Sequence, residues 1–263
     1  MSAPIPPAAP STPATPSAPA ADPALAFARL GLPESQLANL AQLGYHAMTP
    51  IQAASLPLTL AGHDLIAQAK TGSGKTAAFA LPLVTRLQPR QFAVQALVLC
   101  PTRELADQVT VEIRRLARAE DNVKVLTLCG GVPIRNQLAS LEHGAHIVVG
   151  TPGRVLDHLQ RGTLDLGALA TLVLDEADRM LDMGFLADVR RILARLPRTR
   201  QTLLFSATLP GEIRALCREI LVDPVSINVE RRATPATGVT QAVFPVHAAG
   251  KNPLLVALLE TNV

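Results

Sequence analysis

The chain has 263 residues, of which 48% are hydrophobic, and its formal net charge is only +3. This composition supplies a sizeable core for one large or two small domains, and the mild charge permits a polyanionic partner without demonstrating one. The sequence contains no apolar run of the roughly 18 to 20 residues that a membrane span needs, and no basic start followed by an apolar core as in a signal peptide. We therefore expect a cytoplasmic protein that does not contact a membrane, and separately we expect a monomer.

The first 22 residues are almost entirely Pro, Ala, Ser and Thr. Such a segment buries too little apolar surface to offset its ordering entropy, so residues 1–22 are predicted to be a disordered tail. The three cysteines, Cys100, Cys129 and Cys217, are widely spaced and form no C-x-x-C pair. They are predicted to be buried thiols in a reducing compartment, since neither a zinc site nor a disulfide framework fits this spacing.

From residue 23 onward, short apolar runs alternate with helical patterns. The runs occupy residues 64–69, 95–100, 123–129, 146–150, 171–175, 201–206 and 225–229. Several are apolar almost throughout, which is typical of strands buried on both faces of a parallel sheet. The sequence thus predicts an α/β fold with a doubly wound parallel sheet, in which ligands bind beyond the carboxyl ends of the strands.

The first run leads into "AKTGSGKT", residues 69–76, which resembles a phosphate-binding P-loop. Glycines let the backbone N–H groups turn inward toward phosphate oxygens, a lysine adds positive charge, and the final hydroxyl can ligate Mg²⁺. The predicted nucleotide-binding residues here are Thr71, Gly72, Ser73, Gly74, Lys75 and Thr76. The alternative is a glycine-softened helix start, but the preceding strand and the following helix favour the P-loop.

The fifth run ends in "DEAD", residues 175–178. A carboxylate at the end of a parallel strand can hold Mg²⁺ through its water shell, which is the role predicted for Asp175 together with Thr76. Glu176 can orient the attacking water or accept its proton, so Lys75, Asp175 and Glu176 are the predicted catalytic residues. The alternative is an acidic first helical turn favoured by the helix dipole.

Together these blocks resemble the DEAD-box RNA helicase family of superfamily 2. The other blocks, in the family's order, are "GYHAMTPIQ" (44–52), "PTRELADQ" (101–108), "TPGR" (151–154) and "SAT" (206–208). The resemblance implies a RecA-like fold, ATP and Mg²⁺ as cofactors, and RNA as the partner. Runs such as "ALVLCPTRELADQV" resemble a bacterial subfamily of large-subunit ribosome assembly, which implies ribosomal RNA.

The resemblance also implies a Q-motif over residues 27–52. In it, Gln52 reads the adenine edge, Tyr45 stacks on the ring, and Phe27 braces the segment. The residues themselves offer Gln52 another role, because "TPIQ" is a helix-start pattern with Thr49 as the cap and Gln52 as its capping-box partner. Both roles remain open at this stage.

The family's RNA contacts fall on residues suited to a phosphate backbone, where glycines permit close approach and arginines fork onto oxygens. They are Thr102, Arg103, Gly131, Thr151, Gly153 and Arg154. The alternatives are a capped helix start for "TPGR" and a solvated helix position for Arg103. Ser206 and Thr208 could cap the helix expected at 210–221, whereas the resemblance implies that they bond Asp178 and couple the nucleotide and RNA sites.

The resemblance implies two RecA-like domains, of which residues 23–230 would be the first. Residues 231–238 are predicted to be a hinge, and residues 239–263 the opening strand and helix of the second domain. The present chain is therefore expected to bind nucleotide weakly and not to unwind RNA alone. Competing interpretations are another P-loop enzyme, such as a DNA translocase, and a non-catalytic RNA-binding fragment.

Overall fold

The fold is taken from a computed structural model in which residues 26–229 and 242–261 are described. The predicted tail at 1–22 and the predicted hinge at 231–238 lie outside these ranges. The chain divides into two compact units, Met1–Glu230 and Arg231–Val263. The first unit carries the predicted motifs, so its sheet determines where they meet.

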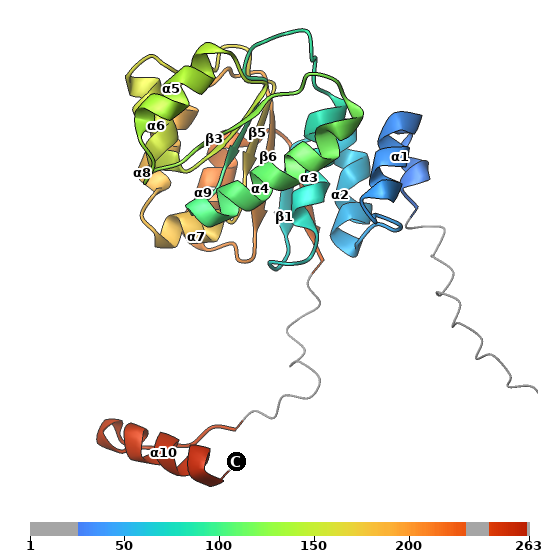
Figure 1. The fold of residues 1–263 in the computed structure, drawn as a ribbon. Helices are drawn as coiled ribbons and strands as arrows, with labels where there is room; N and C mark the ends of the chain where they lie inside the picture. The colour runs from blue at the N-terminus through green and yellow to red at the C-terminus, as the bar shows by residue number, and fades with distance from the viewer. Residues whose placement is uncertain (1–25, 230–241, 262–263) are drawn as a thin grey trace, which may run out of the picture. The chain divides into compact units, whose positions relative to one another are not determined.

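Seven strands form one parallel sheet in the described part of the first unit (Figure 1). They are β1 (Leu65–Gln68), β2 (Ala96–Leu99), β3 (Val125–Leu128), β4 (Ile147–Gly150), β5 (Thr171–Leu174), β6 (Gln201–Ser206) and β7 (Val225–Asn228). Each lies within the apolar run predicted for it. Their order across the sheet is β3-β4-β2-β5-β6-β1-β7, and every paired strand runs parallel to its neighbour. The predicted doubly wound parallel sheet is confirmed.

Helices cover both faces of this sheet. Those of the first unit are η2 (Phe27–Leu30), α1 (Glu34–Gln42), α2 (Pro50–Leu60), α3 (Lys75–Thr85), α4 (Arg103–Leu116), η3 (Ala117–Ala119), α5 (Ile134–Glu142), α6 (Pro152–Gln160), α7 (Ala177–Asp182), α8 (Leu186–Leu193) and α9 (Gly211–Ile220). Successive strand side chains point to opposite faces. In β2, Ala96 and Val98 therefore join the cluster packed by α1 to α4, while Leu97 and Leu99 join that packed by α6 to α9.

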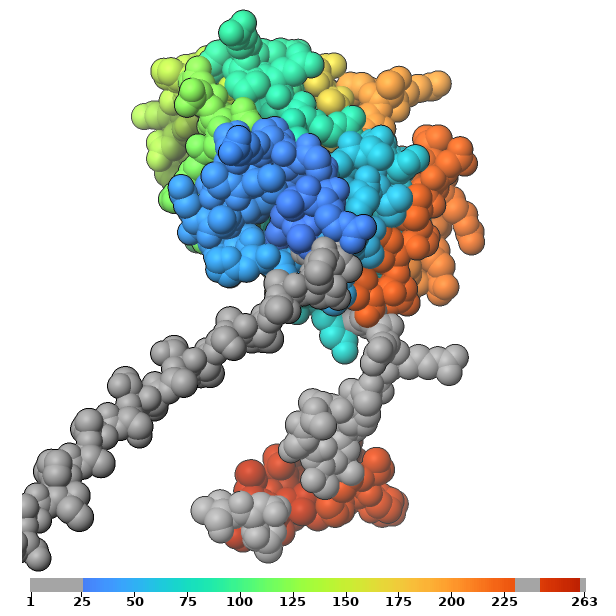
Figure 2. Space-filling model, turned by 90° about the vertical axis from the view of Figure 1, so that its right-hand side faces the viewer, coloured from blue at the N-terminus to red at the C-terminus, as the bar shows by residue number. Residues whose placement is uncertain are grey.

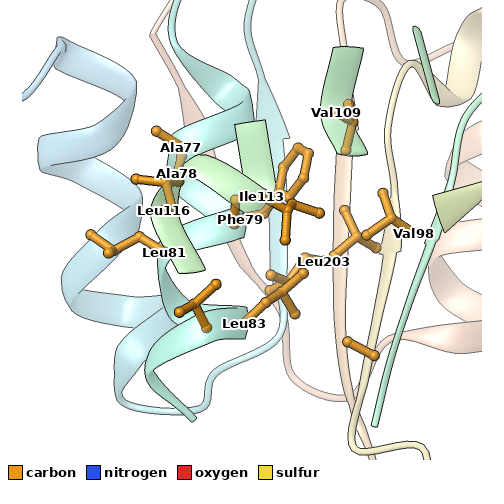
Figure 3. Packing of buried hydrophobic residues seen from close by; sticks show 14 of the residues in the cluster. Ala77, Ala78, Phe79, Leu81, Leu83, Val98, Val109, Ile113, Leu116 and Leu203 are labelled. Atoms are coloured by element: carbon orange, nitrogen blue, oxygen red, sulfur yellow. The ribbon is translucent and has the colours of Figure 1, made fainter. Parts of the chain in front are cut away.

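The core under α3 and α4 is tightly filled (Figure 3). Phe79 of α3 is fully buried, and its ring centroid lies 5.3 Å from that of Phe205 in β6. Burying such a side chain stabilises the fold by about 1.5–3 kcal/mol. Because α3 begins at Lys75, this packing fixes the helix that follows the predicted P-loop.

The N-terminal segment, blue in Figure 2, lies against the body beside α2. Gln36 Nε2 and Asn39 Nδ2 of α1 both donate to the Leu116 carbonyl, at 3.1 and 3.0 Å. These bonds satisfy a carbonyl at the end of α4 that has no partner within its own helix. The segment that carries Phe27 and Tyr45 is thereby anchored to the sheet domain.

In the second unit, the described residues form η4 (Ala248–Gly250) and α10 (Lys251–Thr261). The predicted helix is present, but residues 242–247 have no regular secondary structure, so the predicted strand does not form within them. Cys100, Cys129 and Cys217 are buried free thiols, as predicted. Within the two described ranges, no helix is both long and apolar enough to cross a membrane.

Candidate functional site

The loop between β1 and α3 curls back on itself. Gly74 is the N-cap of α3 with φ +93°, a conformation that strains residues with a side chain. Lys75 is 6% exposed, and its Nζ donates to the Ala69 carbonyl at 3.0 Å. Ser73 Oγ donates to the Lys70 carbonyl at 2.8 Å. The loop is therefore closed by its own side chains, with the lysine ammonium bonded to the carbonyl at the start of the loop.

Gln52 connects this loop to α2. Its Oε1 accepts from the Thr49 N–H at 2.9 Å, which is the predicted capping-box bond, and its Nε2 donates to the Gly74 carbonyl at 3.1 Å. A Cβ on Gly74 would lie 2.7 Å from that Nε2. The capping role of Gln52 is confirmed, and its second bond, to the Gly74 carbonyl, joins α2 to the loop. A primary amide has a second lone pair and a second N–H, so an adenine-reading role remains compatible with these bonds.

The "DEAD" block lies where β5 ends and α7 begins. Asp175 is 2% exposed, and its Oδ1 has no hydrogen-bond partner among the described residues. Burial raises the pKa of this carboxyl to about 6; the Lys75 charge opposes that shift, and the Glu176 charge adds to it. A buried carboxylate oxygen without a partner costs free energy unless a ligand meets it.

Glu176 adopts φ +53° and ψ +53°, the left-handed region that few residues with a side chain enter. Its Oε1 accepts from Thr71 Oγ1 at 3.0 Å, and its Oε2 pairs with Arg179 at 3.3 Å. The acidic block and the P-loop are thus in direct contact. Such strain at a functional position is typical of sites whose geometry is held by their surroundings.

A cavity of about 440 Å³ lies between these elements. The P-loop lines one side, Asp175 and Glu176 line another, and Tyr45 with Glu112 of α4 lines a third. A larger cavity of about 610 Å³ beside β3 contains none of the predicted residues. The smaller cavity is therefore the one lined by predicted nucleotide-binding and catalytic residues.

Tyr45 is held in place at the edge of this cavity. Its hydroxyl donates to Glu112 Oε1 in a very short contact, and its ring makes an edge contact with Phe27 at a centroid distance of 6.1 Å. Burial raises the pKa of Tyr45 well above its ordinary value, and the Glu112 bond and charge raise it further. The bracing predicted for Phe27 is present as this contact. Glu112 was not predicted, because nothing in the pattern of α4 separates it from a solvated helix residue.

The residues present suit a magnesium ion. Asp175 offers a buried oxygen without a partner, Thr76 lines the same cavity, and such hard oxygen donors are those that Mg²⁺ prefers. Among the described residues, no group of three His, Cys, Asp or Glu side chains could hold a metal by itself. A cation here would need ligands from water and phosphate as well.

Asp178 joins β6 to α7. Its Oδ2 accepts from the Thr208 N–H at 2.8 Å and from Thr208 Oγ1 at 2.9 Å, and its own N–H donates to Ser206 Oγ at 3.1 Å. Burial alone would raise the pKa of Asp178, but hydrogen bonds from Thr208 and Ser206 outweigh it and the pKa is lowered. Ser206 and Thr208 do not cap the next helix, whose N-cap residue is Pro210. The capping alternative is therefore wrong, and the implied contacts with Asp178 are present.

The predicted RNA-binding residues lie at the same edge of the sheet, beyond β2, β3 and β4. Thr102 caps α4 by accepting from the Leu105 N–H at 3.3 Å, and Thr151 is the N-cap residue of α6. Gly131 has φ +80°, and a Cβ there would lie 2.3 Å from a guanidinium nitrogen of Arg103. Arg103 thus lies against the loop at residues 130–132, called the "GG" loop after Gly130 and Gly131, rather than standing free.

Gly153 and Arg154 complete this group at the start of α6. A Cβ on Gly153 would have no neighbour within 4 Å, so that surface is open to close approach. Arg154 donates to the Val132 carbonyl at 3.2 Å and to Gln137 Oε1 at 2.8 Å. The "TPGR" helix start and the "GG" loop are therefore joined through a glutamine that the sequence motifs did not include.

The comparison with known proteins agrees with this geometry. The DEAD/DEAH box helicase family matches residues 49–216, well over half of the chain. The chain belongs to this family. The implied RecA-like fold is confirmed, since the DEAD box protein from the hyperthermophile Methanococcus jannaschii has 40% identity and a TM-score of 0.75, covering 89% of this chain and 63% of that one.

Curated members of the DEAD/DEAH box family are also similar in sequence. The ATP-dependent RNA helicase DbpA of Escherichia coli (strain K12) is 55% identical over 239 residues, which is 90% of this chain and 52% of that protein. The DEAD-box ATP-dependent RNA helicase CshA of Geobacillus kaustophilus (strain HTA426) is 44% identical over 234 residues, which is 89% of this chain and 50% of that protein. The chain spans about half the length of these relatives.

Proposed function

We propose that this chain is the ATP-binding half of an ATP-dependent RNA helicase. It binds ATP with Mg²⁺ in the cavity between the P-loop and the "DEAD" block, and it binds RNA through the backbone at the neighbouring strand ends. The observation that carries this proposal is the shared cavity of Lys75, Asp175 and Glu176, with Thr71 bonded across it to Glu176.

The residues of the cavity have distinct roles in this proposal. Lys75 exchanges the Ala69 carbonyl for phosphate oxygens, and the glycine-rich backbone supplies N–H donors around them. Asp175 and Thr76 would hold the magnesium ion, which neutralises phosphate charge when bound. Glu176, released from Thr71, orients the attacking water and accepts its proton.

The adenine would occupy the side of the cavity that Tyr45 lines. Tyr45 stacks on the base, and Gln52 reads its edge with the lone pair and N–H that remain after its bonds to Thr49 and Gly74. A polar site of this kind rejects a base whose donors and acceptors differ, because its own groups would be left unpaired.

RNA would contact Thr102, Arg103, Gly131, Thr151, Gly153 and Arg154. Helix N-termini and arginines bind phosphate oxygens whatever the base, so the binding carries no sequence information. Asp178, Ser206 and Thr208 would couple this surface to the cavity, since one carboxylate bonds both β6 and the loop after it. The resemblance to a ribosome-assembly subfamily leads us to propose ribosomal RNA as the target.

The test is nucleotide binding. A fluorescent ATP analogue is titrated with Mg²⁺ into the wild-type chain and into the Lys75→Ala and Gln52→Ala variants. The Lys75→Ala variant lacks one charge-assisted phosphate contact, so it should bind the ATP analogue about 10- to 100-fold more weakly than the wild type does. Thermal unfolding of each variant controls for the cap that Gln52 supplies. Equal binding by all three folded proteins would eliminate the proposed ATP site.

One observation favours the second candidate, a nucleotide-independent RNA-binding module. Lys75 and Thr71 are engaged within the protein, so the loop is closed without a phosphate. Measuring RNA affinity with and without Mg²⁺ and a non-hydrolysable ATP analogue distinguishes the two candidate functions. Tighter RNA binding with nucleotide supports the helicase half, whereas unchanged affinity supports the module. A DNA strand of the same sequence tests for the alternative of a DNA translocase.

A further inference from the structure

Gln137 of α5 lies between the two loops that carry the proposed RNA contacts. It is 5% exposed, although its helix lies on the surface of the sheet domain. Its Nε2 donates to the Cys129 carbonyl at 2.9 Å, at the start of the "GG" loop. This bond determines which way the amide faces, because a flipped amide would set oxygen against oxygen.

The oxygen of the same amide accepts two hydrogen bonds. One comes from Arg154 Nη1 at 2.8 Å and the other involves His158 Nε2 at 3.0 Å, both from α6. A carbonyl oxygen has two lone pairs, so the acceptor is fully used. Gln137 therefore binds one loop through its nitrogen and one helix through its oxygen, and it cannot rotate without losing all three bonds.

His158 holds the Gln137 amide oxygen from the buried side. It is fully buried, and its Nδ1 lies 2.9 Å from Thr163 Oγ1. Since Gln137 Oε1 can only accept, Nε2 must carry the proton. In the neutral ring Nδ1 is then an acceptor, and the Thr163 hydroxyl lies within donating distance both of Nδ1 and, at 3.2 Å, of the His158 carbonyl. Burial lowers the pKa of His158, and the nearby Arg154 charge lowers it further, so the neutral ring is favoured.

Arg154 is held at the outer end of the network. Besides Gln137, its Nη1 and Nη2 each donate to the Val132 carbonyl at 3.2 Å. A guanidinium has five N–H donors, and these bonds use three of them within the described residues. The two others are available to a phosphate in a fixed direction.

We propose that Gln137 and His158 are positioning residues, which hold the Arg154 guanidinium and the "GG" loop, residues 130–132, in one arrangement for the RNA backbone. The inference rests on the proposed function, because it assigns Arg154 and the "GG" loop to RNA. A free arginine side chain loses considerable rotamer freedom when a ligand fixes it. The network removes that freedom before RNA arrives.

The experiment is a double-mutant cycle on RNA affinity, measured by fluorescence anisotropy of a labelled single-stranded RNA at several salt concentrations. Arg154→Ala should lower affinity and reduce the slope of log K against log salt by about one, as loss of a phosphate contact does. Gln137→Ala should lower affinity by about tenfold, with the slope nearly unchanged because the arginine is still present. In the Arg154→Ala background, Gln137→Ala should lose most of its effect.

Gln201 is a matched control, because it is the first residue of β6 and so lies at the amino ends of the strands, opposite the loops. It is 5% exposed, accepts from Arg86 Nη1 at 2.8 Å, and donates to the carbonyls of Thr59 and His63 at 2.9 and 2.8 Å. Gln201→Ala also removes three side-chain hydrogen bonds, and it should lower thermal stability without changing RNA affinity. A drop in RNA affinity equal to that of Gln137→Ala would show that general destabilisation is the cause.

Two histidine variants keep the proposal testable if Gln137→Ala does not fold. His158→Gln retains a donor near the Nε2 position and should bind RNA nearly as the wild type does. His158→Leu lacks the donor and should reproduce the loss seen with Gln137→Ala. Equal RNA affinities for these two variants would overturn the role assigned to His158.

Amide hydrogen exchange of Gly131 and Val132 separates this inference from the proposed function. Exchange should accelerate in Gln137→Ala and not in Gln201→Ala. Unchanged amide exchange in Gln137→Ala would overturn the positioning role, whether or not the RNA affinity of that variant changes. If exchange accelerates but Arg154→Ala binds RNA as the wild type does, the loop is positioned as inferred, and the assignment of this surface to RNA is wrong.

Discussion

The carboxyl edge of the sheet has two halves that are held together differently. Around the P-loop, two buried charged groups lack a hydrogen bond to a group of opposite charge: a buried Asp175 oxygen has no hydrogen-bond partner among the described residues, and Lys75 bonds a neutral carbonyl. Around the "TPGR" helix, the buried polar side chains Gln137 and His158 have partners of the right kind at each polar atom. The P-loop half thus has buried charge that no partner of opposite charge contacts, whereas the buried polar atoms of Gln137 and His158 are all hydrogen-bonded.

The two halves should therefore respond differently to a ligand. A site with unmatched buried charge gains stability when a ligand supplies the counter-charge, so nucleotide binding should stabilise the domain. A surface whose polar groups are already paired gains little stability, but it presents its donors in a fixed geometry. In the nucleotide half, substitution of Asp175 should therefore improve stability while removing function, whereas substitution of the hydrogen-bonded Asp178 beside it should lower stability.

The largest effect is expected for Glu176→Gln. The amide can still accept from Thr71, so nucleotide affinity should change little, but it cannot accept a proton from water. Phosphate release at saturating ATP and RNA should fall by about 10²- to 10⁴-fold, as for loss of a general base. Release at the wild-type rate would show that Glu176 is not the base, and the fluorescent ATP analogue checks that the variant still binds.

Asp175→Asn should stabilise the ligand-free chain. The pKa of Asp175 is raised to about 6 in the fold, above the unfolded value of about 3.9, so its charged form destabilises the folded state. The penalty is absent below about pH 4, grows as pH rises, and is complete above about pH 6. The variant should therefore be more stable by about 2–3 kcal/mol at pH 8, measured by urea unfolding, and should equal the wild type at pH 4.

The same variant should lose the stabilisation that Mg²⁺ and nucleotide give the wild type. A rise in unfolding temperature with Mg²⁺ and the ATP analogue, present in the wild type and absent in Asp175→Asn, is the expected pair of results. If Asp175→Asn is instead less stable at pH 8, the buried carboxylate has a partner that this structure does not describe. The nucleotide half would then be paired without a ligand, as the other half is.

The sequence predicts the skeleton of this site because strands buried on both faces leave an unmistakable apolar pattern. Each of the seven runs contains its strand, and parallel strands place their carboxyl ends at one edge. The P-loop and "DEAD" residues then fall together because the sheet order sets β1 and β5 on either side of β6. That order itself was not predicted, since nothing local in a strand specifies its neighbour.

The supporting residues could not be predicted for a related reason. Gln137, His158 and Glu112 lie within helices, where one polar residue among many gives no signal until tertiary packing buries it. Gln52 illustrates the middle case: its capping bond follows from local spacing, but its bond to Gly74 depends on a contact 22 residues away. Local chemistry is readable from sequence, and long-range pairing is not.

Asp178→Asn should have the opposite sign to Asp175→Asn, although only three positions separate them. The lowered pKa of Asp178 means that its carboxylate stabilises the fold above the unfolded value of about 3.9, and that this stabilisation is lost as pH falls through the lower folded value. Replacing it should destabilise the chain by about 1 kcal/mol at pH 7, because charge-assisted bonds to Thr208 become neutral. Urea unfolding at pH 7 measures this, and a gain in stability would contradict it.

The smallest effect is expected for Glu112→Gln. The carboxylate accepts from the Tyr45 hydroxyl and pairs with Arg115, which fixes the tyrosine ring at the mouth of the cavity. An amide still accepts this bond but without charge assistance, a difference of about 1 kcal/mol. Affinity for the ATP analogue should therefore fall about fivefold. Glu219→Gln is the matched control, because Glu219 pairs with Arg190 on the exposed surface and neither residue lines the cavity, so it should not change affinity. An equal loss in both variants would attribute the effect to net charge, and the cavity wall would then depend on Tyr45 packing against Phe27 rather than on the anchor from α4.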